Sequence, residues 1–422
     1  MPYHKDFSTY QALDTFAALY GPGNAKAAVG RYEALEKEFL SRYGNGAYRI
    51  FSAPGRTEIG GNHTDHQNGR VLAAAVSLDT IAAVRATESS VVRLQSEGFE
   101  GEFIVDLNEL MPREAERETT CSLIRGVAAR MKEFGYFVGG FDAYVTSTVL
   151  KGSGLSSSAA FEVLVAAILD GLYNAGQMDP KLRAQVAKYA ENVYFGKPSG
   201  LMDQMASSVG GLVTIDFEDE QLPEVKKVSF DFESTGYLLV VTDTGGSHAD
   251  LTYEYAAIPA DMRSVAERFG CQRLREVDPS EFYRQIPLLR EAASDRAILR
   301  AMHFFGDNDR VVQQADALVR GDMEAFFTHI IESGESSWKL LQNCHATGSA
   351  EQGVTLALAL SERLLRGHGA WRVHGGGFAG TIQAFVPRAL LHDYVDELSR
   401  VFGPRACTVL HIRQPGALEI IL

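Results

Sequence analysis

The stretch GSGLSSSAAFEVLVAAILDGL at residues 152–172 joins a glycine-rich loop to an amphipathic helix. Two glycines, Gly152 and Gly154, and a run of three consecutive serines, Ser156, Ser157 and Ser158, precede the apolar run. Glycines allow a backbone to approach a ligand closely, and a helix N-terminus offers free N–H groups with partial positive charge. The pattern is therefore typical of a phosphate site. A serine-capped helix start without any ligand explains the same residues equally well.

The length and the strand pattern of the chain predict an α+β protein with two domains. A chain of 422 residues exceeds what one hydrophobic core usually serves. We place the domains at 1–218 and 219–422, because the stretch EDEQLPEVKK at 218–227 is acidic and contains a proline. Strands and helices alternate in both halves without the regular rhythm of a doubly wound sheet, which favours the α+β class.

Periodicity predicts the main elements. We expect helices over residues 9–43, broken at 20–24, and over 158–173, 180–195 and most of 280–330. We expect a strand at AYRIFSAPG (47–55) that enters a loop at Pro54, and separate strands at VLAAAVS (71–77) and TIAAVRAT (80–87). Further strands are predicted at 211–217 and 237–244, and two more strands flank a glycine loop in WRVHGGGFAGTIQAFVP (371–387).

Composition excludes several classes of function. The net charge of −14 disfavours a general binder of nucleic acid or of a membrane surface, since both are anionic. The four cysteines, Cys121, Cys271, Cys344 and Cys407, form no C-x-x-C pair, so we expect reduced thiols and no zinc site. The N-terminus has no apolar signal-peptide run and the longest apolar run is short, so we expect no membrane span and a cytoplasmic protein.

Three further stretches carry candidate functional groups. APGRTEIGGNHTDHQNG (53–69) concentrates charged and polar side chains between two apolar strands. In AENVYFGKPSGLMDQMASSVGG (190–211), the carboxylate of Asp203 either accepts a proton or caps the next helix. Three glycines in VHGGGFAG (373–380) exceed what a hairpin needs, which indicates either a wide turn or close approach to a ligand.

The order and spacing of these four motifs resemble those of the GHMP kinase superfamily and, within it, the galactokinase family. The family pattern contains Gly-Glu-His-Thr-Asp-Tyr, then Gly-Leu-Ser-Ser-Ser-Ala, then Met-Asp-Gln and a final glycine run. The resemblance covers about residues 48–390. It implies two domains with the active site in the cleft between them, ATP as co-substrate and Mg²⁺ as metal. The implied reaction phosphorylates the anomeric C1 hydroxyl of galactose to give galactose 1-phosphate.

The resemblance also implies a role for each matching residue. Asp203 would act on the C1 hydroxyl as base or orienter, with Arg56 keeping it ionised. The implied sugar-binding residues are Asn62, His63, Asp65, Gly200 and Tyr255. The implied ATP-binding residues are Gly152, Ser153, Gly154, Leu155, Ser156, Ser157, Ser158, Gly376 and Gly377. Ser158 and Glu191 would hold Mg²⁺. The implied partners are a small sugar and ATP, with no nucleic acid and no membrane, and we expect a monomer.

Asn62 departs from the family pattern, which has glutamate before His-Thr-Asp. In the family this glutamate contacts the C6 hydroxyl of the sugar, and an amide there would no longer repel a C6 carboxylate. A kinase for a C6-altered sugar such as galacturonate is therefore an alternative. A non-catalytic sugar sensor is a second alternative, although Ser158-Ala159-Ala160, Arg56, Glu191 and Asp203 are all present, which favours catalysis. A kinase for mevalonate or homoserine is disfavoured by His63-Thr64-Asp65.

Overall fold

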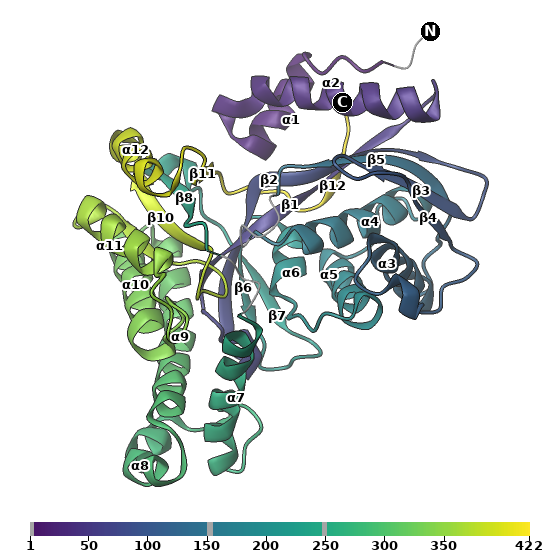
Figure 1. Cartoon of the computed structure of the whole chain (residues 1–422). Helices are drawn as coiled ribbons and strands as arrows, with labels where there is room; N and C mark the ends of the chain where they lie inside the picture. Colours follow the sequence, from purple (N-terminus) through teal and green to yellow (C-terminus); the bar gives the residue numbers. More distant parts are fainter. Residues whose placement is uncertain (1–3, 150–154, 247–250) are drawn as a thin grey trace.

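The computed structural model describes residues 4–149, 155–246 and 251–422. Within these ranges it contains two sheets, one of eight strands and one of four, with helices on both faces of the larger sheet (Figure 1). The mixture of helices with largely antiparallel strands confirms the α+β class.

The larger sheet has the strand order β12-β1-β2-β5-β3-β4, and β6 and β7 extend it from β2. Its strands are β1 (Arg49–Gly60), β2 (Arg70–Ala86), β3 (Val91–Ser96), β4 (Phe103–Asp106), β5 (Phe141–Ser147), β6 (Leu212–Asp216), β7 (Glu224–Val228) and β12 (Leu418–Ile420). The β3–β5 pair is parallel, and the other pairs are antiparallel. The long β2 pairs with β6 through its first half and with β5 through its second half.

Two strand predictions are wrong. The expected strands at 71–77 and 80–87 form one continuous strand, β2. β1 does not enter a loop at Pro54 but continues to Gly60, with a register shift between Pro54 and Arg56. Proline lacks an N–H and is tolerated in strands at such irregularities. The continuation matters because it carries Arg56 and Glu58 into the centre of the molecule.

Helices bury both faces of the larger sheet. One face packs against α3 (Thr120–Glu133), α4 (Ser157–Tyr173) and α5 (Pro180–Tyr189) in one apolar cluster, with α6 (Met202–Val209) beside them. The other face packs against α1 (Tyr10–Tyr20) and α2 (Ala25–Tyr43). These helices confirm the predicted break near residues 20–24, where the short 3₁₀ turn η1 (Pro22–Asn24) separates α1 from α2.

The smaller sheet has the order β11-β8-β10-β9 and packs against helices from the second half of the chain. Its strands are β8 (Tyr237–Asp243), β9 (Ala370–Val373), β10 (Thr381–Pro387) and β11 (Cys407–Leu410). The helices are α7 (Thr252–Arg268), α8 (Pro279–Ala292), α9 (Asp295–Arg320), α10 (Met323–Ser336), α11 (Gly353–Leu365) and α12 (Leu391–Phe402). A shared apolar cluster of β2, β8, α9 and α10 joins the two sheets.

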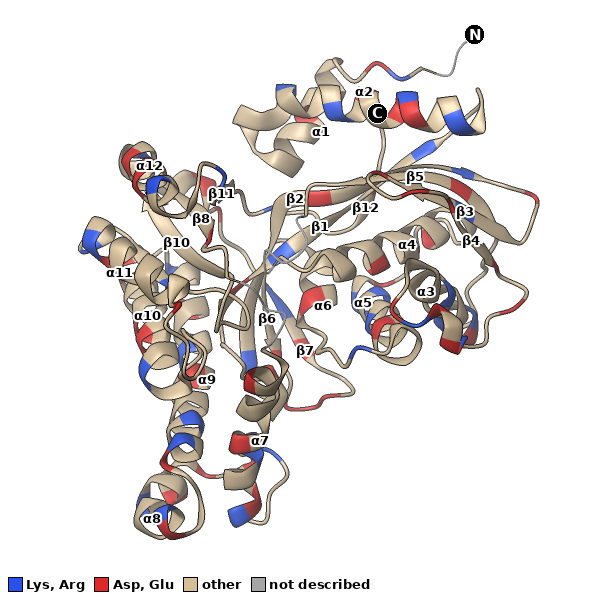
Figure 2. Cartoon of the chain, viewed as in Figure 1, with Lys and Arg blue, Asp and Glu red and all other residues tan. Residues whose placement is uncertain are grey.

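The division into 1–218 and 219–422 stays a prediction. β7 follows the expected seam in sequence yet pairs with β6, and β12 returns from the C-terminus to pair with β1. Figure 2 shows basic and acidic residues interspersed along the outer helices. The four cysteines are unpaired, as expected. Within the described ranges, no helix combines the length and hydropathy that a bilayer-spanning segment needs.

Candidate active site

Asp203 and Arg56 form the centre of the site. Asp203 lies in the first turn of α6, whose N-cap is Leu201, so Asp203 is not the capping residue of this helix. Arg56 Nε donates to Asp203 Oδ1 at 2.7 Å, and Ser156 Oγ donates to Asp203 Oδ2 at 2.6 Å. Burial alone would raise the pKa of Asp203, but Arg56 and then Ser156 bring it below its usual value. The carboxylate is therefore ionised at neutral pH.

Leu155, at the end of the predicted phosphate loop, is hydrogen-bonded to the backbone of β1. Arg56 N donates to Leu155 O at 3.1 Å, and a side chain at Gly55 would come within 3.0 Å of the same oxygen. Ser156 is the N-cap residue of α4 and adopts a left-handed conformation with φ 59° and ψ 68°. Non-glycine residues rarely adopt this conformation, and where they do the surrounding structure holds them there. In this left-handed conformation, the Ser156 hydroxyl donates its hydrogen bond to Asp203.

Glu191 is a second buried carboxylate, and it faces the N-terminus of α4. It lies in the π-helical turn η4 (Ala190–Phe195), and its Oε1 accepts from Ser158 Oγ at 2.9 Å. Lys197 Nζ lies 2.9 Å from the same oxygen. On the other oxygen, Ser199 Oγ donates at 2.6 Å and Gln204 Nε2 at 2.7 Å. Burial lowers the pKa of Lys197, but Glu191 and other nearby carboxylates raise it above its usual value, so the ammonium group is charged at neutral pH.

A cavity of about 400 Å³ opens beside Ser157 and Ser158. Four phenylalanines give it an aromatic lining: Phe99, Phe103, Phe161 and Phe195. A flat apolar ring system fits such a lining, and a phosphate chain attached to it would lie at the N-terminus of α4. The sequence interpretation missed this cavity because no spacing along the chain connects the four phenylalanines.

Asp65 and Gly200 line a second, more polar pocket of about 300 Å³. A side chain at Gly200 would come within 2.6 Å of Asp65 Oδ2, so the glycine is required for this close approach. Polar and charged groups complete the lining, among them His66, Asn68, Asn192, Ser199, Arg263 and Arg273. The aromatic cavity thus reaches Ser157, next to the Ser156 that contacts Asp203, and the polar pocket reaches Gly200 and Leu201, just before α6.

Comparisons with known proteins give the family. A family model described as the galactokinase galactose-binding signature matches residues 37–86, and one described as the GHMP kinase N-terminal domain matches residues 122–211. The galactokinase of Streptomyces coelicolor is 30% identical over 354 residues, which is 84% of this chain and 88% of that protein. The chain belongs to the galactokinase family.

Other relatives agree. The galactokinase of Lacticaseibacillus casei is 29% identical over 371 residues, covering 87% of this chain and 93% of that protein. The crystal structure of Lactococcus lactis galactokinase with galactose has a TM-score of 0.78 at 24% identity, covering 93% of this chain and all (100%) of that one. A mevalonate kinase from Methanococcus jannaschii has a TM-score of 0.62 at 13% identity, covering 87% of this chain and 99% of that chain. The two-domain fold of the GHMP kinases is therefore confirmed.

Within this galactokinase-family chain, the prediction that Asn62 presents its amide to a sugar needs correction. The residue is fully buried, and protein groups take both ends of its side chain. Its Nδ2 donates to Glu58 Oε1 at 3.0 Å and to Gly375 O at 2.8 Å. Its Oδ1 accepts from Ser337 Oγ at 3.2 Å and from Asn343 Nδ2 at 2.8 Å. Asn62 therefore connects β1 to segments of the second half of the chain.

Glu58 and His63 belong to the same buried network. Glu58 Oε1 accepts from Arg372 Nη2 of β9 at 2.8 Å. Burial raises the pKa of Glu58 to about 7, although Arg372 opposes the shift. His63 has φ 57° and its Nε2 donates to Gly376 O at 3.0 Å. Burial lowers the pKa of His63 to about 4, so its ring is neutral at physiological pH.

The predicted glycine loop contacts protein groups. Tyr255 Oη donates to Gly377 O at 2.9 Å, and a side chain at Gly376 would come within 2.6 Å of the Tyr255 ring. A side chain at Gly377 would come within 2.2 Å of Asn343 O. The close approach that the glycines allow is thus made by Tyr255 and Asn343. Contact of Gly376 and Gly377 with ATP stays a prediction.

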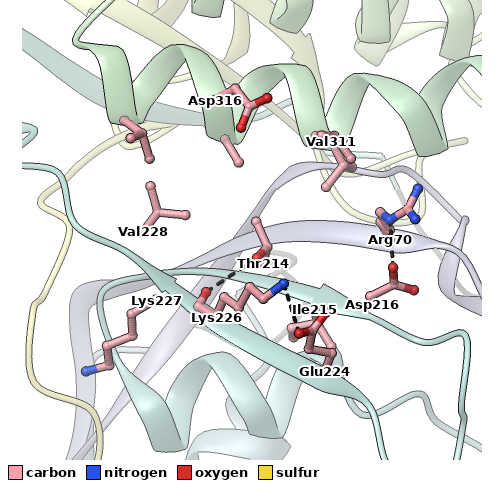
Figure 3. Close-up of a pocket in the computed structure, with 13 residues that line it drawn as sticks. Arg70, Thr214, Ile215, Asp216, Glu224, Lys226, Lys227, Val228, Val311 and Asp316 are labelled. Carbon is pink, nitrogen blue, oxygen red and sulfur yellow. Dashed lines mark hydrogen bonds and ion pairs between the residues drawn. The ribbon is translucent and has the colours of Figure 1, made fainter.

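The structure places Arg56 and Ser156 against Asp203, Ser158 against Glu191, and Gly200 against Asp65. The predicted residues His63, Tyr255, Gly376 and Gly377 lie with Asn62 in the buried network around Asn343. Gly152, Ser153 and Gly154 lie outside the described residues. Another hollow, between the β6–β7 hairpin and α9, is lined by residues outside the predicted site (Figure 3). Four of its charged residues form two pairs, Arg70 with Asp216 at 2.7 Å and Lys226 with Glu224 at 2.9 Å. Sequence reasoning missed Lys197, Gln204 and Arg372, since only the tertiary fold gives them their partners.

Proposed function

We propose that this chain is an ATP-dependent sugar kinase that phosphorylates the anomeric C1 hydroxyl of galactose to give galactose 1-phosphate. The contacts of Asp203 with Arg56 and Ser156 carry the proposal, and an aromatic cavity at Ser157 and a polar pocket at Gly200 support it. Membership of the galactokinase family supports the choice of reaction and of galactose. A cytoplasmic monomer with the domain division given above is part of the same proposal.

Asp203 orients the attacking hydroxyl. Its lowered pKa makes it a weak base, so it accepts a hydrogen bond from the C1 hydroxyl and takes the proton late, as the new oxygen–phosphorus bond forms. Phosphoryl transfer has a loose transition state and needs positioning and charge neutralisation more than early deprotonation. The guanidinium of Arg56 holds Asp203 ionised and lies where it can neutralise charge on the transferred group.

The nucleotide would bind along α4. The aromatic cavity takes the base, and the N–H groups of Leu155, Ser156 and Ser157 at the start of α4 face the phosphates. The Ser158 hydroxyl and the Glu191 carboxylate are hard oxygen donors of the kind that Mg²⁺ prefers. Glu191 already pairs with the Lys197 ammonium on the oxygen that Ser158 contacts, which supports this as a position for a cation. Bound Mg²⁺ would supply charge neutralisation at the phosphates.

The sugar would bind against Asp65 and Gly200, with Tyr255 and His63 on the side of the second domain. Asp65 accepts hydrogen bonds from ring hydroxyls in this proposal. The galacturonate alternative depended on a free amide at Asn62. Because four protein groups already engage that amide, the alternative loses its basis, and galactose remains the lead acceptor.

The test is product identification with the purified full-length chain. ATP, Mg²⁺ and one sugar at a time, from galactose, galacturonate and arabinose, are incubated with the protein, and phosphorus and proton NMR identify the product. We expect galactose 1-phosphate from the unmodified chain and at least a thousandfold lower rate from Asp203→Asn. A folded protein that binds galactose and ATP without turnover would make the chain a sensor and overturn the proposal.

A further inference from the structure

Lys197 places an ammonium group at the point where the nucleotide phosphates are expected. Its Nζ and the Ser158 Oγ both lie 2.9 Å from one atom, Glu191 Oε1. Ser158 belongs to the first turn of α4, whose free N–H groups form the anion-binding end of the helix. The ammonium group and the helix N-terminus therefore meet on the same carboxylate oxygen.

The backbone of Lys197 is fixed, whereas its side chain is not enclosed. Lys197 N donates to Glu191 O at 3.1 Å, and it stands between Gly196, with φ 91°, and Pro198. The side chain of Lys197 is 58% exposed, compared with 2% for Glu191. The ammonium group can therefore move over a few ångströms without disturbing the packing of the core.

The hydrogen bonds of Glu191 do not depend on Lys197. Neutral groups of Ser158, Ser199 and Gln204 already donate to both carboxylate oxygens. The ammonium group adds charge to this set and can be replaced there by another cation. Among the residues that the structure describes, Arg56 and Lys197 are the cations in contact with the two carboxylates of the site, and Arg56 is engaged by Asp203.

We propose that Lys197 is a phosphate-binding residue of this chain, which pairs with Glu191 in the free protein and contacts the phosphates of a bound nucleotide. A metal ion that binds Glu191 competes with the ammonium group for Oε1 and releases it toward the phosphates. This inference depends on the proposed kinase function for the nature of the ligand. It concerns binding, so it is tested without turnover.

The experiment measures ADP binding by isothermal titration calorimetry in EDTA and then across a Mg²⁺ series. Lys197→Met removes the charge at similar length, and Lys197→Arg keeps it. Lys226→Met is the matched control, because Lys226 Nζ also lies 2.9 Å from a glutamate oxygen but on β7, in the hollow of Figure 3. Thermal melts confirm that each variant is folded.

We expect Lys197→Met to bind ADP about 10- to 100-fold more weakly in EDTA, the size of one charge-assisted hydrogen bond. The same variant should reach half-saturation at several-fold lower Mg²⁺, because no ammonium group competes for Glu191. Lys197→Arg should restore ADP affinity to within about threefold, and Lys226→Met should match the unmodified chain. ADP affinity unchanged in Lys197→Met overturns the proposal, even if the Mg²⁺ dependence changes. Failure of the unmodified chain to bind any nucleotide would instead refute the proposed kinase function.

Discussion

Replacing Arg56 by methionine should move the ionisation of Asp203, and with it the acid limb of kcat/KM, into the neutral pH range. Arg56 Nε and Asp203 Oδ1 are 2.7 Å apart, and both side chains are largely buried. At an effective dielectric constant of about 20, two unit charges about 4 Å apart interact by about 4 kcal/mol, or about 3 pKa units. Without Arg56, burial dominates and the pKa of Asp203 rises from below its usual value toward neutrality.

The sign of the effect follows from which form of Asp203 is active. In the proposed reaction the ionised carboxylate accepts the hydrogen bond of the sugar hydroxyl, so activity should fall as pH drops through the raised pKa. In the unmodified chain this loss lies below the acidic end of an ordinary assay range. In Arg56→Met the acid limb of kcat/KM should appear about 2 to 3 pH units higher, on top of a roughly 100- to 1,000-fold lower rate at all pH values.

The assay is kcat/KM for galactose at saturating ATP from pH 5 to pH 9. Arg56→Lys keeps the charge and should leave the acid limb near its original position, although it loses rate. The double variant Arg56→Met with Asp203→Asn should show no limb in this range. An Arg56→Met variant whose rate falls by the same factor at every pH would refute the assignment of Arg56 as the group that keeps Asp203 ionised.

Three further predictions follow from burial and partners. Asn62→Ala should destabilise the protein by about 2 to 4 kcal/mol because it leaves buried groups unpaired, lowering Tm by roughly 2 to 5 °C, while the KM for galactose changes less than threefold; an unchanged Tm with a tenfold higher KM would restore Asn62 to the sugar site. Phe99→Ala should raise the KM for ATP about tenfold and leave the KM for galactose unchanged, and equal rises in both would exclude the aromatic cavity as the base site. Because the pKa of Glu58 is raised to about 7 in the folded chain, the stability that Glu58 contributes should be lost as pH rises from about 4.5 to 7, so the Tm of the unmodified chain should fall relative to that of Glu58→Gln over this range in a pH series of thermal melts.

The sequence predicts those helices and strands whose signals come from residues close together along the chain. The periodicity of residues 158–173 predicts α4, and serines before an apolar run predict its start, because both signals are local. The pairing of Arg56 with Asp203 was predicted only through family resemblance, since 147 positions separate the two residues. Nothing in the local sequence around either residue selects the other as its partner.

Long-range partners explain the two main errors. The separate strands expected at 71–77 and 80–87 leave Asp79 between them, yet Asp79 is fully buried, and its carboxylate is bonded by Arg31, Tyr20 and Arg413. A buried carboxylate with such partners does not interrupt a strand, so β2 runs through it. Asn62 is a parallel case, because its partners Ser337, Asn343 and Gly375 lie 275 to 313 positions further along the chain.

The polar residues of the 53–69 motif therefore divide between two tasks. Arg56, at one end, holds the carboxylate of Asp203 that we propose as catalytic, while Asn62 and His63 bond the loop of Gly375 and Gly376 in the second half of the chain. Because one strand and its following turn carry both sets of contacts, the position of the catalytic pair depends on the contact between the two halves. A substitution that loosens the buried network should thus lower kcat through misplacement of Arg56, even where it leaves every group that touches sugar or nucleotide unchanged.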